Sequence, residues 1–353
     1  MMKTKSISWP VLIGCLIPLT LAISGLPALA QTPSTYWVST EDTDWFNCDN
    51  WTNGCPDNTK DTYISNGFKS QITSAEGTAR SLTLGLNLGE SGQLLVDSVH
   101  GSLIVAQGGE SPIPGDVYVG NVGIGVLNIT GGGSVTCGNA YIAASASPLT
   151  TSSSVTVSGA GSRWTMSYLN SGGQARLYVG GSNAGNGGAG LLTVSNGGTV
   201  EVGDDTNAAA IRVLSSGTVT GNGSITMYYS RQPIMVVFGT IEPSNGTLFI
   251  GGNLVLYEDA TTVSNVTPQA ADNLDITGTS SLDGRLSVTM TGDFASAPTQ
   301  YTLLHASAGL SNTRFFSVSI MYPTGHGWHP TITYDPPDDP HYVHLNRIFD
   351  LHP

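Results

Sequence analysis

Residues 117–138 read VYVGNVGIGVLNITGGGSVTCG, and residues 177–203 read LYVGGSNAGNGGAGLLTVSNGGTVEVG. Tyr118 in the first segment corresponds to Tyr178 in the second, and the glycines, leucines and valines that follow correspond as well. The second segment is longer by five residues, within a Gly/Asn/Ser stretch at residues 181–188 that a surface loop can accommodate. Repetition of short strands is typical of solenoids, in which each coil buries its apolar face against its neighbours. The sequence therefore predicts a stack of coils rather than a globule around one deep pocket.

The composition also favours short strands joined by turns. The chain has 353 residues, of which 45 are glycine, and only 10% are charged, against about 25% in typical soluble domains. Gly, Ser, Thr, Val and Asn take the positions that a helical protein would give to Glu, Lys, Ala and Leu. We therefore expect an all-β chain.

Residues 76–290 repeat a pattern of strand, glycine turn and strand. In VLNIT, Leu127 and Ile129 point to one side, whereas Asn128 and Thr130 point to the other. The gaps between strands are irregular, and few of them are the two-residue Asn-Gly turns of hairpins. The repeated strands keep the same facing, which favours parallel stacking at about 4.8 Å per coil. The sequence predicts a parallel β-helix (β-solenoid) over this region.

The two ends of the chain differ from the repeats. Residues 31–75 are rich in Trp, Asp, Asn and Cys, and we expect an N-terminal cap over the open edge of the first coil. Over residues 240–320 the pattern weakens, and an antiparallel sandwich is the alternative there. Residues 291–353 are expected to form a C-terminal cap and an irregular extension rich in His, Pro and Asp.

Residues 1–30 have the features of a signal peptide. Lys3 and Lys5 precede an apolar run, and the ALA sequence at residues 28–30 is a small-x-small cleavage site. A lipoprotein signal at Cys15 is disfavoured because the apolar run continues well past it. A retained membrane helix is disfavoured because proline and glycine interrupt that run. We expect an exported protein, extracellular or at a bacterial cell surface, with no integral membrane segment in the mature chain.

The charge excludes some classes of partner. The formal net charge is −13 at pH 7, and without residues 1–30, which hold two lysines and no acidic residue, it becomes −15. An acidic surface argues against nucleic acid and against anionic membranes as partners.

Three cysteines remain after the predicted cleavage. Cys48 and Cys55 are close in sequence in an exported context, and a disulfide between them is expected. A zinc site would need two further ligands, and none is evident nearby. Cys137 corresponds to Val202 in the repeat, so we interpret it as a small core residue rather than a reactive thiol.

Residues 153–205 carry a resemblance to a known family. Their sequence, SSVTVSGAGSRWTMSYLNSGGQARLYVGGSNAGNGGAGLLTVSNGGTVEVGDD, resembles the repeat of autotransporter (type V secretion) passengers and PEP-CTERM surface proteins of bacteria. The matching pattern is V-x-V-x-G-x-G-S-x-W, then L-x-V-G, then G-x-L-x-V-x-x-G-G-x-V, and weaker similarity covers most of residues 37–320. The resemblance implies a secreted, right-handed β-helical rod, and the family has no catalytic residues to transfer. No C-terminal barrel or PEP-CTERM anchor is evident in this sequence, which leaves release and anchoring both open.

Histidines near the C-terminus are candidate metal ligands. His326, His329, His341 and His344, with neighbouring aspartates, could bind Zn²⁺, Ni²⁺ or Cu²⁺. Histidines spaced at i and i+3 converge on a helix, however, and the prolines argue against one. A solvated or packed tail is therefore the favoured interpretation, and no cofactor is expected.

Tyr118 and Tyr178 are candidate ligand contacts. Both lie between inward-facing residues of a predicted strand, so both are expected to face solvent. Exposed tyrosines could stack on sugar rings of an extracellular polysaccharide. Simple packing at the edge of the coil is the favoured alternative.

The sequence favours a structural function over a catalytic one. A polysaccharide lyase would need clustered carboxylates and a basic residue, but the arginines of the repeats are widely spread. We expect a secreted or cell-surface, adhesin-like scaffold without catalytic activity, which contacts polysaccharide or other cell-surface components. The alternative is an extracellular polysaccharide-binding or polysaccharide-lyase β-helix. A cleft lined by converging Asp and Arg would favour the alternative, and smooth Ser/Thr/Asn faces would favour the scaffold.

Overall fold

The computed structural model describes residues 32–108, 113–145, 152–167, 174–204, 209–228, 233–323, 328–335 and 340–349. The unit of residues 33–353 is compact, and it contains all the strands that the structure describes. The predicted signal sequence, residues 1–30, lies outside the described residues. In the described part of the chain, no helix has the length and apolar character needed to cross a membrane.

Three long sheets contain nearly all the strands. The first sheet holds β1 (Ser34–Tyr36), β2 (Asp61–Ile64), β5 (Ser81–Leu84), β9 (Val117–Val119), β12 (Ala140–Ile142), β15 (Ala175–Val179), β20 (Ala209–Val213), β23 (Ile234–Val237), β26 (Asn253–Leu256) and β29 (Ser280–Leu282). The second holds β3 (Asn66–Ile72), β6 (Ser91–Asp97), β10 (Ile124–Thr130), β13 (Ser153–Ser158), β18 (Gly190–Ser195), β21 (Gly217–Gly221), β24 (Thr240–Pro243), β27 (Thr261–Val266), β30 (Arg285–Met290) and β32 (Ser317–Met321).

The third sheet holds β4 (Glu76–Ala79), β7 (Ser102–Gln107), β11 (Ser134–Cys137), β14 (Arg163–Met166), β19 (Thr199–Val202), β22 (Ser224–Met227), β25 (Thr247–Gly251), β28 (Asn273–Ile276), β31 (Gln300–Ala306), β34 (Tyr342–Phe349) and β33 (Trp328–Asp335). Smaller elements are β8 (Ile113–Pro114), which pairs with β7, the hairpin of β16 (Gly181–Ser182) and β17 (Gly185–Asn186), and the short 3-10 helix η1 (Cys48–Asn50).

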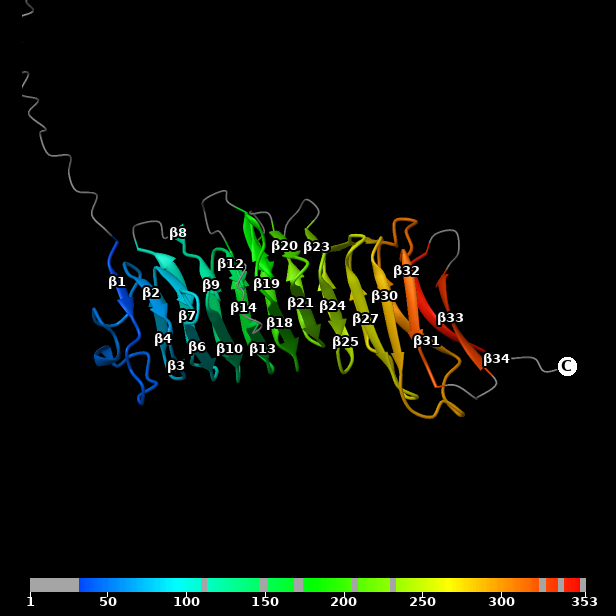
Figure 1. Ribbon diagram of the computed structural model, residues 1–353, viewed down its shortest axis with the longest axis horizontal. Coiled ribbons are helices and arrows are strands. Elements are labelled where there is room, and N and C mark those ends of the chain that lie inside the picture. The colour runs from blue at the N-terminus through cyan, green and yellow to red at the C-terminus, as the bar shows by residue number, and fades with distance from the viewer. Residues whose placement is uncertain are drawn as a thin grey trace, which may run out of the picture. The chain divides into compact units, whose positions relative to one another are not determined.

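The chain visits the three sheets in turn, which makes each circuit one coil of a parallel β-helix. Coils run from β2–β3–β4 to β29–β30–β31, and Figure 1 shows them side by side between β1 and β33. Strands from successive coils pair in parallel, as in β10 with β13 and β13 with β18. The predicted all-β parallel solenoid is therefore confirmed.

Parallel pairing extends beyond residues 76–290 on both sides. β2 and β3 already pair in parallel with β5 and β6, and β30 pairs in parallel with β32. Within residues 240–320, β24 pairs in parallel with β27, and β25 with β28. The alternative of an antiparallel sandwich for that region is therefore wrong.

The core consists of columns of apolar side chains that run from coil to coil. One column of fully buried residues in the second sheet contains Leu94, Leu127, Val155, Leu192, Val219 and Ile241. Alternation along each strand sends every second residue inward, so parallel register places like residues on top of one another. Burial of such columns contributes about 25 cal/mol per Å² of apolar surface and is the main stabilising interaction between coils.

Cys137 belongs to one of these core columns. In the third sheet it pairs in register with Met166, which in turn pairs with Val202. It is fully buried, and burial raises the pKa of its thiol. The interpretation of Cys137 as a core residue is confirmed.

A tryptophan cluster closes the N-terminal end of the core. Trp37, Trp45 and Trp51 are buried, and both Trp37 and Trp45 pack edge-on against Trp51 with ring centroids 5.0 Å apart. The indole nitrogen of Trp51 donates a hydrogen bond to the carbonyl of Trp45 at 2.9 Å. A Cβ atom at Gly77 would lie 3.0 Å from Trp45 Nε1, so Trp45 covers the interior of the first coil.

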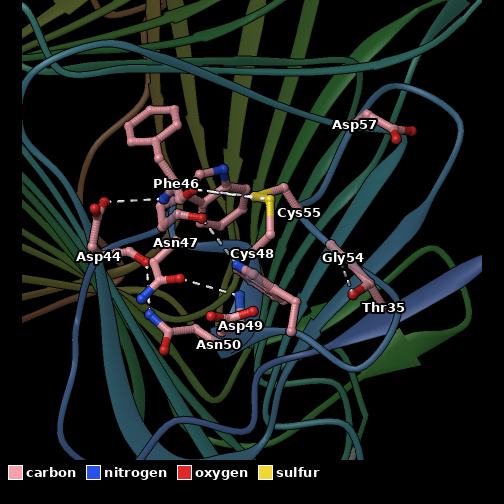
Figure 2. Close-up of a disulfide and its surroundings, with 12 residues drawn as sticks. Thr35, Asp44, Phe46, Asn47, Cys48, Asp49, Asn50, Gly54, Cys55 and Asp57 are labelled. Atoms are coloured by element: carbon pink, nitrogen blue, oxygen red, sulfur yellow. Dashed lines mark hydrogen bonds between the residues drawn. A yellow bond between two sulfur atoms is a disulfide. The ribbon is translucent and has the colours of Figure 1, made fainter.

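A disulfide staples this cap. Cys48 and Cys55 are bonded as expected, and Figure 2 shows the bond beside Phe46, whose carbonyl lies 3.2 Å from Cys55 Sγ. The side chain of Asn47 caps η1 by accepting a hydrogen bond from the Asp49 backbone nitrogen. The disulfide thus closes the loop that carries Trp51, which contacts Trp45 over the core.

The C-terminal end of the third sheet is closed by two strands of opposite direction. β34 pairs antiparallel with β31, and β33 pairs antiparallel with β34. Arg347 on β34 is buried, and its guanidinium lies 4.9 Å from the Trp328 ring centroid and donates to the carbonyl of Ala297 at 2.9 Å. Two segments of the region expected to be irregular, β33 and β34, are therefore paired strands at the end of the third sheet.

Candidate functional site

The two tyrosines singled out from the sequence belong to one ladder on the first sheet. Tyr118 on β9 pairs in register with Tyr141 on β12, and Tyr141 pairs with Tyr178 on β15. The rings stack nearly parallel, with centroids 4.7 Å apart for the first pair and 5.4 Å for the second. Tyr118 and Tyr178 therefore lie two coils apart, with Tyr141 between them.

The expectation that both tyrosines face solvent is wrong for Tyr178. Tyr118 is half-buried, but Tyr178 is only 3% exposed. Tyr141 covers one face of the Tyr178 ring, and the Tyr178 hydroxyl donates to Asn183 Oδ1 at 3.2 Å. Asn183 belongs to the hairpin of β16 and β17, which occupies the stretch where the repeat is five residues longer.

Stacking within the ladder restricts what the rings can bind. A sugar ring packs against an exposed aromatic face, and both faces of Tyr141 are already covered by its neighbours. The face of Tyr118 directed away from Tyr141 looks toward Thr83, its register partner in the preceding coil. A sugar could therefore contact the ring at the end of the ladder, Tyr118, but could not stack on the rings along its length.

A cavity of about 270 Å³ lies at the Tyr118 end of the ladder. Asp61, Arg80, Ser81, Asp116 and Tyr118 line it. One guanidinium nitrogen of Arg80 lies 3.0 Å from both carboxylate oxygens of Asp61, and Ser81 Oγ donates to Asp61 at 2.6 Å. We call this cavity the Asp/Arg pocket.

The two carboxylates of the Asp/Arg pocket have different surroundings. Burial raises the pKa of Asp116, although the backbone and side-chain nitrogens of Asn139 donate hydrogen bonds to it and oppose that shift. Asp61 instead faces the cation of Arg80, whose guanidinium nitrogen lies 3.0 Å from its carboxylate. The pocket thus combines donors, acceptors and an aromatic ring, which is the set of groups that hydrogen-bond sugar hydroxyls and pack on a sugar ring.

The predicted metal ligands are spread over several positions. His329 on β33 pairs with Ile348, whereas His344 on β34 pairs with Thr333, four residues along the same ladder. At about 3.4 Å per residue, His329 and His344 lie more than 13 Å apart along the strands. His341 Nδ1 lies 3.0 Å from the carbonyl of Ala306.

His326, the remaining member of the predicted metal set, lies outside the described residues. Across the part of the chain that the structure describes, no three His, Cys, Asp or Glu side chains gather closely enough to hold a metal ion.

A second histidine arrangement was not expected from the sequence. His305 Nδ1 lies 2.8 Å from Asp275, the ring of His305 stacks on Tyr342, and Tyr342 stacks in turn on His344. His344 Nδ1 lies 3.2 Å from Thr302 Oγ1. These contacts connect β34 to its neighbour β31 in the third sheet.

Comparison with known proteins adds no family assignment. No protein-family model matches the chain, and no curated protein matches it significantly.

Proposed function

We propose that the protein is an exported, adhesin-like β-helical scaffold that acts by presenting regular surfaces rather than by catalysis. The observation that carries this proposal is the register of outward side chains. In the second sheet, Asn128, Thr156, Thr193 and Thr220 occupy one outward column on four successive coils. A solenoid spaces such groups by about 4.8 Å along its axis, so that many weak contacts can act together.

The third sheet carries a similar outward column. It contains Thr136, Thr165, Glu201 and Thr226. The side chains also contact one another: Thr165 Oγ1 donates to Glu201 at 3.4 Å, and Arg163 lies 3.6 Å from Glu201. Each of these two columns is therefore polar and regular over four coils, which is the property expected of a scaffold face.

The disulfide supports export, because disulfides persist in oxidising compartments. The N-terminal cap and the C-terminal strands cover apolar side chains at the two edges of the stack of coils. Such coverage is expected of a solenoid, whose first and last coils would otherwise expose their edges. Neither feature depends on the resemblance to bacterial surface proteins, which points in the same direction.

Cell fractionation combined with an attachment assay tests the scaffold proposal. Antibody against the chain should label intact producing cells or the culture supernatant, and cells without the protein should attach less to a surface. A deletion of the coil β18–β19–β20 that joins the preceding coil directly to the following one, with the strand register kept, should reduce attachment without abolishing it. Binding is distributed over coils, so the remaining coils should still contribute. Detection only inside cells, or unchanged attachment without the protein, would disprove the proposal.

A second candidate function is glycan binding or cleavage at the Asp/Arg pocket. Asp61, Asp116 and Arg80 converge there beside Tyr118, which is the kind of cleft expected of the polysaccharide-directed alternative. Incubation with a panel of polysaccharides separates the two: new reducing ends indicate cleavage, whereas retention on immobilised glycan without product indicates binding. Asp116→Asn should abolish cleavage, and Tyr118→Ala should weaken binding. If neither occurs with any glycan, this candidate is eliminated.

A further inference from the structure

The opposite end of the tyrosine ladder also borders a cavity. It measures about 180 Å³, and Gln174, Arg176, Tyr178, Asn183 and Arg212 line it over an apolar floor from β20 and β23. We call it the arginine pocket. It lies on the same sheet as the Asp/Arg pocket, with Tyr118, Tyr141 and Tyr178 between the two.

The two arginines of this pocket have no acidic partner among the described residues. Arg176 Nε donates to Gln174 Oε1 at 2.9 Å, and among the described residues neither Arg176 nor Arg212 forms an ion pair with a carboxylate. Arg80 and Arg163, by contrast, each lie within 4 Å of an acidic side chain. The chain has 12 basic and 25 acidic residues, so two such neighbouring arginines form a positively charged patch on a protein of net negative charge.

The register holds these cations close together. Tyr178 pairs with Arg212 and Arg176 pairs with Ala210, so the arginines are diagonal neighbours on adjacent strands. An anion bound between two such diagonal neighbours would interact with both guanidinium groups. Guanidinium groups are suited to this because their planar donors match carboxylate, sulfate and phosphate oxygens.

The wall of the pocket is built by the hairpin that interrupts the repeat. β16 and β17 place Asn183 beside the Tyr178 hydroxyl, at 3.2 Å, and Asn183 also lines the cavity. The hairpin thus adds an amide to the two guanidinium groups and fixes the tyrosine that forms one side of the pocket. Without the insertion, the repeat would present an open sheet face here.

We propose that the arginine pocket binds the anionic group of an acidic saccharide, either a uronate carboxylate or a sulfate ester. The guanidinium groups of Arg176 and Arg212 would pair with the anion, Asn183 and Gln174 would hydrogen-bond hydroxyls, and the apolar floor would contact the sugar ring. The cavity measures about 180 Å³, less than the about 300–1,000 Å³ of sites for drug-sized ligands, so it would hold part of a longer saccharide.

The acidity of the whole chain does not prevent this binding. Charges farther away than a Debye length of about 8 Å are largely screened at physiological ionic strength, so the nearest charges determine the local attraction. The proposal goes beyond the scaffold function and does not rest on it, because the pocket would bind its ligand wherever the protein is located.

Calorimetry on the full-length protein tests the proposal with four probes: an oligomer of galacturonic acid, a sulfated oligosaccharide, the neutral galactose oligomer and inorganic phosphate. We expect one acidic oligomer to bind at least about tenfold more tightly than the neutral oligomer, and to bind more weakly as salt is added. The tighter of the two acidic oligomers identifies the anionic group.

Matched variants locate the binding. The double variant Arg176→Gln/Arg212→Gln should lose at least about tenfold in affinity, whereas Arg285→Gln, which removes another exposed arginine on β30, should leave affinity unchanged. Circular dichroism and thermal unfolding confirm that each variant is folded. Three results would overturn the proposal: no binding of either acidic oligomer, equal binding of the neutral oligomer or of phosphate alone, or equal loss in Arg285→Gln.

Discussion

A methyl group on the Cα atom of Gly190 would lie 2.5 Å from the backbone nitrogen of Gly180. The two glycines meet at the corner between β15 and β18, where the chain passes from the first sheet to the second. Gly180 has a φ of +79°, which glycine adopts without strain, whereas Gly190 needs only the space. A Cβ atom at Gly180 would also lie 2.4 Å from the backbone nitrogen of Gly217, so the corner needs glycine at both positions.

Substitution of Gly190 by alanine should destabilise the protein strongly. The added atom would meet backbone, which cannot move aside as a side chain can, so we expect a loss of about 3 kcal/mol or more. Gly89→Ala is the matched control: Gly89 has a φ of +83° but nothing within 4 Å of the added atom, and about 1 kcal/mol is expected from its conformation alone. Urea unfolding of both variants checks the order, and a larger loss at Gly89 would contradict this account.

Removal of the middle tyrosine should weaken the ladder more than removal of its hydroxyl. Tyr141→Ala eliminates two stacked contacts, at 4.7 and 5.4 Å, and should cost about 1–3 kcal/mol because each aromatic pair contributes about 0.5–1.5 kcal/mol. Tyr141→Phe keeps both contacts and should retain most of that stability. The free energy of unfolding of the two variants decides this, and equal losses would show that stacking is not the stabilising interaction.

Loss of the disulfide should destabilise the N-terminal cap. The bond closes a loop with a sequence separation of 7, for which chain entropy predicts about 2.5 kcal/mol. Cys48→Ser/Cys55→Ser should therefore lower the unfolding temperature, and tryptophan fluorescence should report earlier exposure of Trp45 and Trp51. A reducing agent should reproduce the effect in the unsubstituted protein and leave the double variant unchanged, since Cys137 is buried.

The partly buried carboxyl of Asp116 should give stability an unusual dependence on pH. Burial raises its pKa above 3.8 in the folded protein, so the folded state holds the proton more tightly than the unfolded state. The resulting stabilisation is complete below pH 3.8 and is lost as the pH rises through the folded-state pKa. Asp116→Asn should therefore gain stability at pH 7, by less than about 1 kcal/mol, and gain none at pH 3.

Asp57 provides a control of opposite sign. Burial would raise its pKa, but hydrogen bonds from Thr59 and the Lys60 ammonium at 3.0 Å outweigh that effect and lower it. The stabilisation from Asp57 is present above pH 3.8 and is lost as the pH falls. Asp57→Asn should therefore lose stability at pH 7 and none at low pH, as measured by unfolding at both values. The same sign for Asp57→Asn and Asp116→Asn would contradict the assignment.

The fold was predictable because alternation and repetition are local properties of the chain. Leu127 and Ile129, assigned to one face from their spacing, are both fully buried. The ladder was only partly predictable because Tyr141 lies in a coil whose corner has no glycine to mark it. Ala143 takes the place of Gly120 there, with a φ of +55° against +78°, so the repeat pattern is hidden at this position.

The surroundings of the site could not be predicted from alternation. Tyr178 occupies an outward position by strand periodicity, yet it is covered because Asn183 returns over it from a hairpin outside the repeat. Convergence of Asp61, Arg80 and Asp116 likewise depends on how many residues each coil contains, which repetition alone does not specify. Length differences between coils thus set the chemistry of the surface, while the repeat sets the core.

The hairpin at β16 and β17 lengthens one coil without shifting its neighbours, since β15 still pairs in register with β12 before it and β20 after it. The spacing between coils is therefore set by backbone hydrogen bonds between paired strands and not by the number of residues in each turn. A foreign peptide inserted at such a corner would be displayed at a fixed distance from each of the other coils. The chain is therefore suitable for arranging several ligands at defined intervals.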